Sequence, residues 1–164
     1  GTKSRKTYLI RDGVMVGRLH NAATAVDFNE NLTGNARATS FEYEPIVRMT
    51  NTYIESGKKP LCLLIGEVDN GFLIETIKSG FGSTNFTISP AIAYRIRKGT
   101  IAEPVKISLL TGNAFETLFK IDGISDEVSL NENPFVSCTK RDQSMLPIDF
   151  GGPYVRISEI DVVG

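Results

Sequence analysis

The sequence predicts a mainly β domain of the α+β class: an antiparallel β-sheet or barrel-like domain with two or three short helices. Most apolar residues occur in short runs that are β-branched or alternate with polar residues, and Gly, Asn and Pro separate these runs. Two pairs of runs are joined by the turn sequences Asp12-Gly13 and Lys98-Gly99. A type I′ turn requires positive φ at both central residues and favours such dipeptides. Each turn therefore predicts a β-hairpin.

Further strands are expected where β-branched or alternating apolar residues recur. Their predicted ranges are Val47–Ile54, Gly71–Lys78, Glu127–Leu130, Met145–Phe150 and Tyr154–Val162.

Three short helices are predicted between the strands. Residues 20–30 place Ala22, Ala25 and Val26 on one side of a helix. A second helix begins near Pro60, which favours the first helical position. A third follows Asn113, whose side chain is placed to cap the first turn. The apolar face of this third helix is expected to carry Phe115, Leu118 and Phe119.

Two short motifs occur twice in the same order. "YLIRDG" at residues 8–13 resembles "YRIRKG" at residues 94–99, and "LTGNA" occurs at residues 32–36 and again at residues 110–114. Chance similarity of two hairpin-and-turn units is one explanation. The identical pentapeptide after matched hairpins favours a partial internal duplication.

Composition limits the classes of function. The 164 residues are 41% hydrophobic and 23% charged, which is typical of a globular domain with its own core. The formal net charge of −1 gives no basis for attraction to nucleic acid or to an anionic membrane, so neither is expected as a partner. No apolar run approaches the about 18 residues that span a bilayer. Two cysteines form no disulfide framework, so a cytoplasmic protein is expected. Residues 1–6 are interpreted as a cloning remnant and charged lead-in, and residues 7–164 as the domain.

Few residues are suited to chemistry. His20 is the only histidine, which excludes a His-rich metal cage and any Ser-His-Asp triad in which it is not the base. At the start of a predicted helix it is interpreted as a partly exposed structural residue. The predicted strand at residues 47–54 has a polar face with Arg48, Thr50 and Thr52. Such a strand either pairs with an extended peptide through its edge or is simply half exposed.

The cysteines differ in their neighbours. Cys62, in "PLCLLIG", is expected to be a buried apolar residue. Cys138 also has apolar neighbours, but Lys140 and Arg141 follow it and favour the thiolate, the form that binds zinc or attacks electrophiles. One thiolate does not hold zinc, because a catalytic site needs about three protein ligands. Cys138 is therefore either an inert core thiol or one part of a site whose other ligands lie outside this chain.

Three stretches resemble the C-terminal domain of the TldD/PmbA family, zinc metalloproteases once labelled modulators of DNA gyrase. They are "GRLHNAATA…LTGNARATS…VRMTNTYIESG", "AYRIRKGTIAEPVKISLLTGNAFETLFKI" and "SCTKRDQSMLP…GGPYVRISEIDVVG". The resemblance covers most of the chain, from Tyr8 to the end. Arg-Met-Thr-Asn-Thr-Tyr and the Cys-x-Lys-x-x-Gln ending are its most specific signals. The chain departs from the family pattern at Thr139 and Asp142, where the family has glycines.

The resemblance implies a zinc-dependent peptidase that acts on unfolded or extended peptides. Cys138 would be the third zinc ligand beside two histidines of an upstream His-Glu-x-x-x-His helix, whose glutamate would be the general base. Lys140 and Gln143 would support the ligand loop. The proposed substrate-binding residues are Arg48, Thr50 and Asn51. Because the upstream helix lies outside this chain, the chain alone is expected to be inactive.

A second interpretation is a non-catalytic subunit that binds peptides and assembles with an active partner. The family resemblance implies a homodimer or heterodimer with a TldD/PmbA-type subunit in either case. Partner subunits that are inactive usually lack the cysteine, so Cys138 favours the catalytic type. The presence of His-Glu-x-x-x-His upstream in the parent gene would distinguish the two. The charge balance gives no support to DNA contact.

Overall fold

The computed structural model describes residues 1–131, 137–148 and 150–164. The chain forms two compact units. The first unit contains residues 1–53 and 130–151, and the second contains residues 54–129 and 152–164. The prediction of a mainly β fold with three short helices is confirmed.

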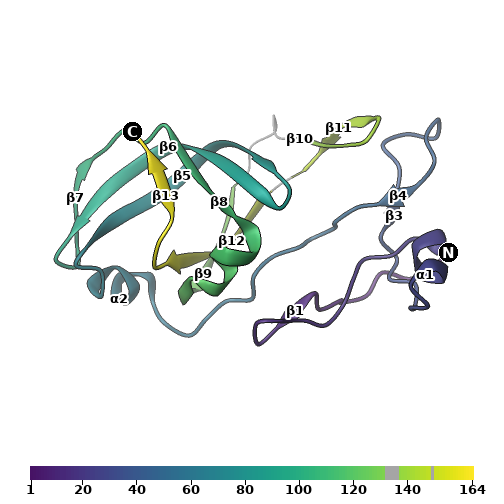
Figure 1. The fold of residues 1–164 in the computed structure, drawn as a ribbon, viewed down its shortest axis with the longest axis horizontal. Coiled ribbons are helices and arrows are strands. Elements are labelled where there is room, and N and C mark those ends of the chain that lie inside the picture. The colour runs from purple at the N-terminus through teal and green to yellow at the C-terminus, as the bar shows by residue number, and fades with distance from the viewer. Residues whose placement is uncertain (132–136, 149) are drawn as a thin grey trace. The chain divides into compact units, whose positions relative to one another are not determined.

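The first unit consists of small antiparallel pairs and one helix (Figure 1). Strand β1 pairs with β2, β3 with β4, and β10 with β11. The elements are β1 (Ile10–Arg11), β2 (Val14–Met15), α1 (Ala22–Asp27), β3 (Ala36–Arg37), β4 (Ile46–Val47), β10 (Ser137–Lys140) and β11 (Gln143–Pro147).

The second unit is built around the long hairpin of β5 and β6 (Figure 1). One edge of β6 pairs with β5, and its other edge pairs with β8 and then with β7. Strand β13 extends the sheet beyond β8, and β9 pairs with β12 in a second sheet. The elements are α2 (Leu61–Gly66), β5 (Asn70–Gly82), β6 (Asn85–Arg97), β7 (Thr100–Pro104), β8 (Leu109–Asn113), α3 (Ala114–Phe119), β9 (Ile121–Asn131), β12 (Phe150–Ile157) and β13 (Asp161–Val163).

The five-stranded sheet is open, so the barrel-like arrangement that the sequence suggested is not formed by the described strands. Its edge strands are β13, β5 and β7. One buried apolar cluster of this unit consists of Ala93, Ile107 and Leu110, and Ile74, Ile88, Val105 and Ile160 pack against it. Full burial of a Leu or Ile side chain stabilises a fold by about 1.5–3 kcal/mol, so Ile107 and Leu110 of this cluster each contribute to the stability of the unit.

Both predicted hairpin turns are confirmed. Asp12 and Gly13 have φ of 50° and 76°, and Lys98 and Gly99 have φ of 46° and 73°. The second turn is also held from outside the hairpin. The Lys98 amide donates to the Asp69 carbonyl at 2.7 Å, and the Gly99 amide donates to the Val68 carbonyl at 2.8 Å.

The predicted strands at residues 71–78 and 127–130 are parts of the longer β5 and β9, and the other three predicted strands extend beyond the strands that form. The strand expected over residues 47–54 ends at Val47, because its ladder with β3 ends where the Arg48 amide donates to the Asn35 carbonyl at 2.9 Å. Alternation of apolar and polar residues does not by itself supply a partner strand. The strand expected over residues 145–150 is interrupted, since β11 ends at Pro147, which has no amide hydrogen to donate.

The third case is the strand expected over residues 154–162, which is two strands. Strand β12 ends at Ile157, and the next amide, of Ser158, donates to the Lys120 carbonyl at 2.9 Å. The chain then joins a different sheet, where β13 pairs with β8. A change of partner at this point divides one apolar run between two sheets.

The helices begin where their caps predict. Asn113 caps α3, and its Oδ1 accepts from the Phe115 and Glu116 amides at 3.0 and 3.3 Å. Pro60 lies one position earlier than predicted, at the N-cap of α2. No helix in the described ranges has both the length and the apolarity that crossing a membrane requires.

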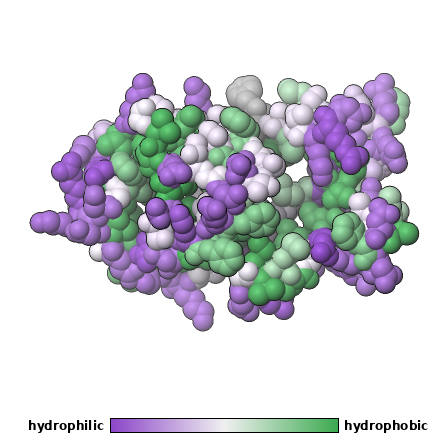
Figure 2. Space-filling model, in the orientation of Figure 1, coloured by the Kyte–Doolittle hydropathy of each residue, from purple (hydrophilic) through white to green (hydrophobic). Residues whose placement is uncertain are grey.

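The predicted apolar faces of the helices are only partly buried: Ala25 of α1 and Leu64 of α2 are buried, but other apolar residues of the helices are not. Phe119 of α3 and Val26 of α1 are each 81% exposed, and Cys62 of α2 is exposed rather than buried. Figure 2 shows apolar side chains at the surface over the place that α3 occupies in Figure 1. Each helix has only six residues, less than two turns of 3.6 residues, so its sequence does not determine which side faces the sheet.

The two "LTGNA" pentapeptides have different structures. Residues 32–35 of the first lie outside any strand, and its Gly34 has a φ of +75°, whereas Gly112 of the second lies in the extended strand β8. The side chain of Asn35 donates to the Arg48 carbonyl, while Asn113 caps a helix. The structural similarity of the two regions is therefore limited to their hairpin turns.

We predict that Gly99→Ala destabilises the second unit more than Gly13→Ala destabilises the first. Both glycines have left-handed φ, which costs an alanine about 1–2 kcal/mol. A Cβ at Gly99 would also lie 2.5 Å from the Gly66 carbonyl oxygen, whereas a Cβ at Gly13 would have no heavy atom within 4 Å. Amide hydrogen exchange in each unit should show a loss of about 2–4 kcal/mol for Gly99→Ala and about 1 kcal/mol for the control. Equal losses would contradict the role of the Gly66 contact.

Candidate functional site

The hairpin of β10 and β11 carries Cys138. Cys138 lies opposite Leu146, and Lys140 lies opposite Gln143, with a register shift between the two pairs. The hairpin turns through Arg141 and Asp142, and Arg141 has a left-handed φ of 55°. A bulge at a register shift like that between Cys138 and Lys140 redirects a strand locally, and such bulges are common beside functional sites. Cys138 is thus placed on a paired strand rather than in a loose loop.

The Cys138 thiol is free and half-buried. In the part of the chain that the structure describes, no three His, Cys, Asp or Glu side chains are grouped so that they could hold a metal ion. A free thiol with partial access to solvent fits the role of a single thiolate ligand. The remaining ligands of any metal at Cys138 would have to come from outside the described residues.

The side chain of Gln143 connects this hairpin to the segment of residues 39–48. Gln143 is 2% exposed. Its Nε2 donates to the Glu44 carbonyl at 2.8 Å, and its Oε1 accepts from the Thr39 amide at 3.1 Å. Its own main-chain carbonyl accepts from Nη2 of Arg48 at 2.9 Å. A buried amide whose polar groups are bonded to main chain in this way fixes the position of the hairpin.

Lys140 makes a second connection between the same segments. Its Nζ donates to the Val47 carbonyl at 2.5 Å. The two residues that the family resemblance assigned to support of the cysteine loop, Lys140 and Gln143, therefore both contact the segment of residues 39–48. The sequence separation of these contacts is 93 residues or more, so no local pattern could have predicted them.

The three residues expected on the substrate side lie in different surroundings. Arg48 is 3% exposed, and its guanidinium is directed at the Gln143 carbonyl rather than at solvent. Thr50 and Asn51 are exposed and follow the end of β4. The structure thus brings Arg48 together with Gln143, which sequence analysis had placed in the site for separate reasons.

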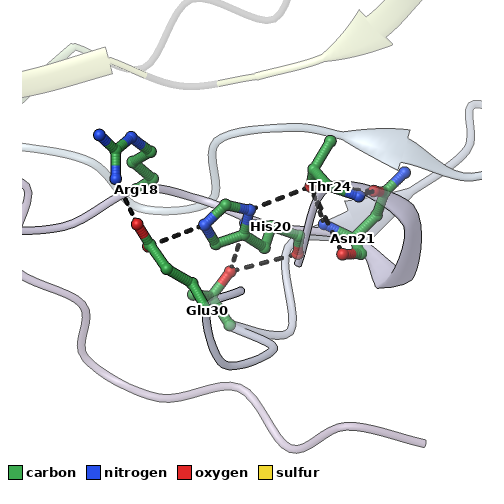
Figure 3. A network of polar contacts seen from close by, with 6 residues as sticks. Arg18, His20, Asn21, Thr24 and Glu30 are labelled. Atoms are coloured by element: carbon green, nitrogen blue, oxygen red, sulfur yellow. Dashed lines mark hydrogen bonds and ion pairs between the residues drawn. The ribbon is translucent and has the colours of Figure 1, made fainter. Parts of the chain in front are cut away.

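His20 is buried within a polar network rather than partly exposed, as the sequence had suggested (Figure 3). Its Nε2 lies 2.9 Å from Oε2 of Glu30, and its Nδ1 lies 3.1 Å from Oγ1 of Thr24. Glu30 also pairs with Arg18. The Thr24 hydroxyl accepts from the Asn21 amide as part of the α1 capping box, so it is a structural group and not a free nucleophile.

The pKa of Glu30 lies below its usual value. The hydrogen bond with His20 is the main cause, and the positive charge of Arg18 adds to it, while partial burial opposes both. The carboxylate is therefore held in its charged form beside the only histidine of the chain.

A cavity of about 250 Å³ lies in this unit beside the hairpin turn. Sequence analysis did not anticipate it, because its walls come from three segments, residues 18–28, 46–47 and 140–141, that are far apart in the sequence. The cavity is lined by Arg18, Leu19, His20, Asn21, Thr24, Phe28, Ile46, Val47, Lys140 and Arg141.

We predict that Gln143→Leu destabilises the first unit by about 2–4 kcal/mol, because it leaves the Thr39 amide and the Glu44 carbonyl without their partner. Ser144→Ala, at the exposed neighbouring position, is the control and should change the free energy of unfolding by less than about 0.5 kcal/mol. Urea denaturation of both variants measures this. A Gln143→Leu variant as stable as the control would contradict the connecting role of the amide.

We predict a pH-dependent effect for Glu30→Gln. Because the folded-state pKa of Glu30 is lowered, its carboxylate contributes stability that is fully present above its unfolded pKa and is lost as the pH falls through the lower folded value. The variant should therefore be less stable than wild type at pH 7, and the difference should disappear in acid. Denaturation from pH 7 to pH 3 tests this, with Glu44→Gln as control for the loss of one charge. A difference that persists at pH 3 would show that charge is not the cause.

Comparisons with known proteins agree with the fold and identify the family. The family model described as the PmbA/TldA metallopeptidase C-terminal domain matches residues 1–164, and this range includes the residues 1–6 expected as a lead-in. A metalloprotease of Synechocystis sp. is 41% identical over 165 residues, which cover 100% of this chain and 35% of the relative. A zinc metalloprotease TldD homolog of Saccharolobus solfataricus is 28% identical, with coverage of 100% and 37%.

The fold is also that of a solved structure. TldE from Thermococcus kodakarensis matches with a TM-score of 0.75 at 23% identity, over 98% of this chain and 34% of that protein. The chain spans about a third of the length of the curated relatives it matches. The match to the family model over the whole chain shows that this chain belongs to the PmbA/TldA metallopeptidase family and corresponds to the family's C-terminal domain.

Proposed function

We propose that this domain is the C-terminal part of a zinc-dependent metallopeptidase that acts on unfolded or extended peptides, and that Cys138 supplies one zinc ligand. The observation that carries the proposal is the placement of Cys138, whose free, half-buried thiol lies on a hairpin that Gln143 and Lys140 connect to a second segment. The family membership and the name of one relative as a zinc metalloprotease support the choice of metal.

The zinc would be held by the Cys138 thiolate and by two histidines of an upstream His-Glu-x-x-x-His helix, as the family resemblance implies. Bound zinc would supply Lewis-acid activation of a water molecule and of the peptide carbonyl. This chain's own contribution would be to hold one zinc ligand, the Cys138 thiolate, in position before the metal binds. A thiolate on a fixed hairpin loses little conformational freedom when it binds, which is why supporting contacts around metal ligands affect affinity.

Residues around Cys138 would have two different roles: some would hold the hairpin in position, and others would contact the peptide substrate. Gln143 and Lys140 hold the hairpin in position. Arg48, which directly follows β4, donates a hydrogen bond to the Gln143 carbonyl. Arg48 would therefore support the substrate cleft by stabilising the hairpin, without itself contacting the peptide. Thr50 and Asn51, which are exposed directly after it, are the residues that would contact an extended peptide.

We predict that Cys138→Ser in the full-length parent protein removes most of the bound zinc and lowers peptidase activity by at least about 100-fold, because a serine hydroxyl is a poor substitute for a zinc-binding thiolate. Cys62→Ser is the matched control, since Cys62 is the other free cysteine and lies on α2 of the second unit. Zinc content by elemental analysis and hydrolysis of an unstructured peptide are the two measurements. Unchanged zinc and unchanged activity in Cys138→Ser would refute the proposal.

The same experiment separates the alternative, a non-catalytic peptide-binding or assembly subunit of a TldD/PmbA-type heteromer. That function predicts a wild-type parent without zinc and without hydrolysis, whose peptide binding survives Cys138→Ser. Inspection of the parent gene for His-Glu-x-x-x-His gives the same distinction without an experiment.

A further inference from the structure

We propose that the cavity beside the β10–β11 turn is a subsite for a carboxylate of the peptide substrate, either an acidic side chain or the C-terminal carboxylate. This inference rests on the proposed peptidase function, which supplies the kind of ligand. The cavity itself is defined by the first unit alone.

The charge of the cavity wall is the first argument. Three of the lining residues, Arg18, Lys140 and Arg141, are cationic, and no lining residue is acidic. The charge of Arg18 is offset by its ion pair with Glu30. Lys140 donates to the Val47 carbonyl, which satisfies one of its three hydrogens but does not neutralise its charge. Among the described residues, no carboxylate forms an ion pair with Lys140 or Arg141.

The size and polarity of the cavity decide the class of ligand. Its volume of about 250 Å³ is below the roughly 300–1,000 Å³ of pockets that enclose drug-sized molecules. One side chain or one chain terminus fits such a volume. Ile46, Val47 and Phe28 supply apolar wall, which suits the methylene groups of an acidic residue and lowers the local dielectric around its carboxylate.

The position of the cavity relates it to the proposed zinc ligand. Lys140 and Arg141 lie two and three residues beyond Cys138 on the same hairpin. At about 3.3 Å per residue of strand, they lie within about 10 Å of Cys138 along the chain. An extended peptide with its scissile bond near Cys138 would therefore place a group one to three residues away beside these cations.

The test measures peptide binding and not cleavage. The full-length parent carrying Cys138→Ser is titrated with fluorescent unstructured peptides that differ only by Glu or Gln at one position, or by a free or amidated C-terminus. We expect the acidic member of one such pair to bind at least about tenfold more tightly, with the preference reduced in 1 M NaCl. The position of that pair shows which carboxylate is recognised.

Matched variants connect the preference to the cavity. Arg141→Gln should abolish it, whereas Arg37→Gln, which removes the same charge from an exposed site of the same unit outside the cavity, should preserve it. Unchanged thermal unfolding of both variants confirms folding. Equal affinity for acidic and neutral peptides, or equal loss of the preference in both variants, would overturn the inference. Zinc content and hydrolysis are measured separately, so a failure of the peptidase proposal would be distinguishable from a failure of the subsite.

Discussion

The contacts of the buried Gln143 amide are the constraint on which the first unit depends. In its described residues this unit contains two-stranded pairs and one short helix, and no extended sheet among them holds the segments in place. A single side chain with 2% exposure instead bonds main-chain groups of Thr39 and Glu44, 99 residues or more away in sequence. Since an unsatisfied buried polar group costs about 1–3 kcal/mol, loss of this amide would penalise both segments at once. Any function of Cys138 depends on the hairpin that this amide positions.

Arg48 and Lys140 both stabilise the position of the hairpin, but they differ in whether their charge is also available to a ligand. Arg48 donates to the Gln143 carbonyl from a buried position, and Lys140 donates to the Val47 carbonyl from an exposed one. Both stabilise the same junction between residues 39–48 and the hairpin, but only Lys140 also presents its charge to a cavity. An Arg fixes the geometry through its planar guanidinium, while a Lys retains two further hydrogens for another partner. The junction and the proposed carboxylate subsite therefore lie next to each other, and both result from the packing of the hairpin against residues 39–48.

Parts of the structure that depend on neighbouring residues were predictable. The turns at Asp12-Gly13 and Lys98-Gly99 and the cap at Asn113 follow from backbone preferences of a few residues. The extents of strands were less predictable, because β4 ends where its partner ends and not where its alternation does. The burial of His20, which precedes α1, and the exposure of Phe119 were missed because tertiary packing decides which side chains are covered. Pattern analysis could not predict the cavity, because three segments far apart in the sequence form it.

The sequence by itself determined the mainly β class, the positions of the hairpins and helix starts, and the family, because these depend on local conformational preference and on motifs that are contiguous in the chain. It also determined that one histidine and one cysteine in the right motif are too few for a complete zinc site. Only the tertiary structure decided that Gln143, Lys140 and Arg48 meet, that Arg48 is buried while Thr50 and Asn51 are exposed, and that Arg18 and Arg141 line one cavity. These are contacts between residues far apart in sequence, and their formation depends on the packing of the whole unit.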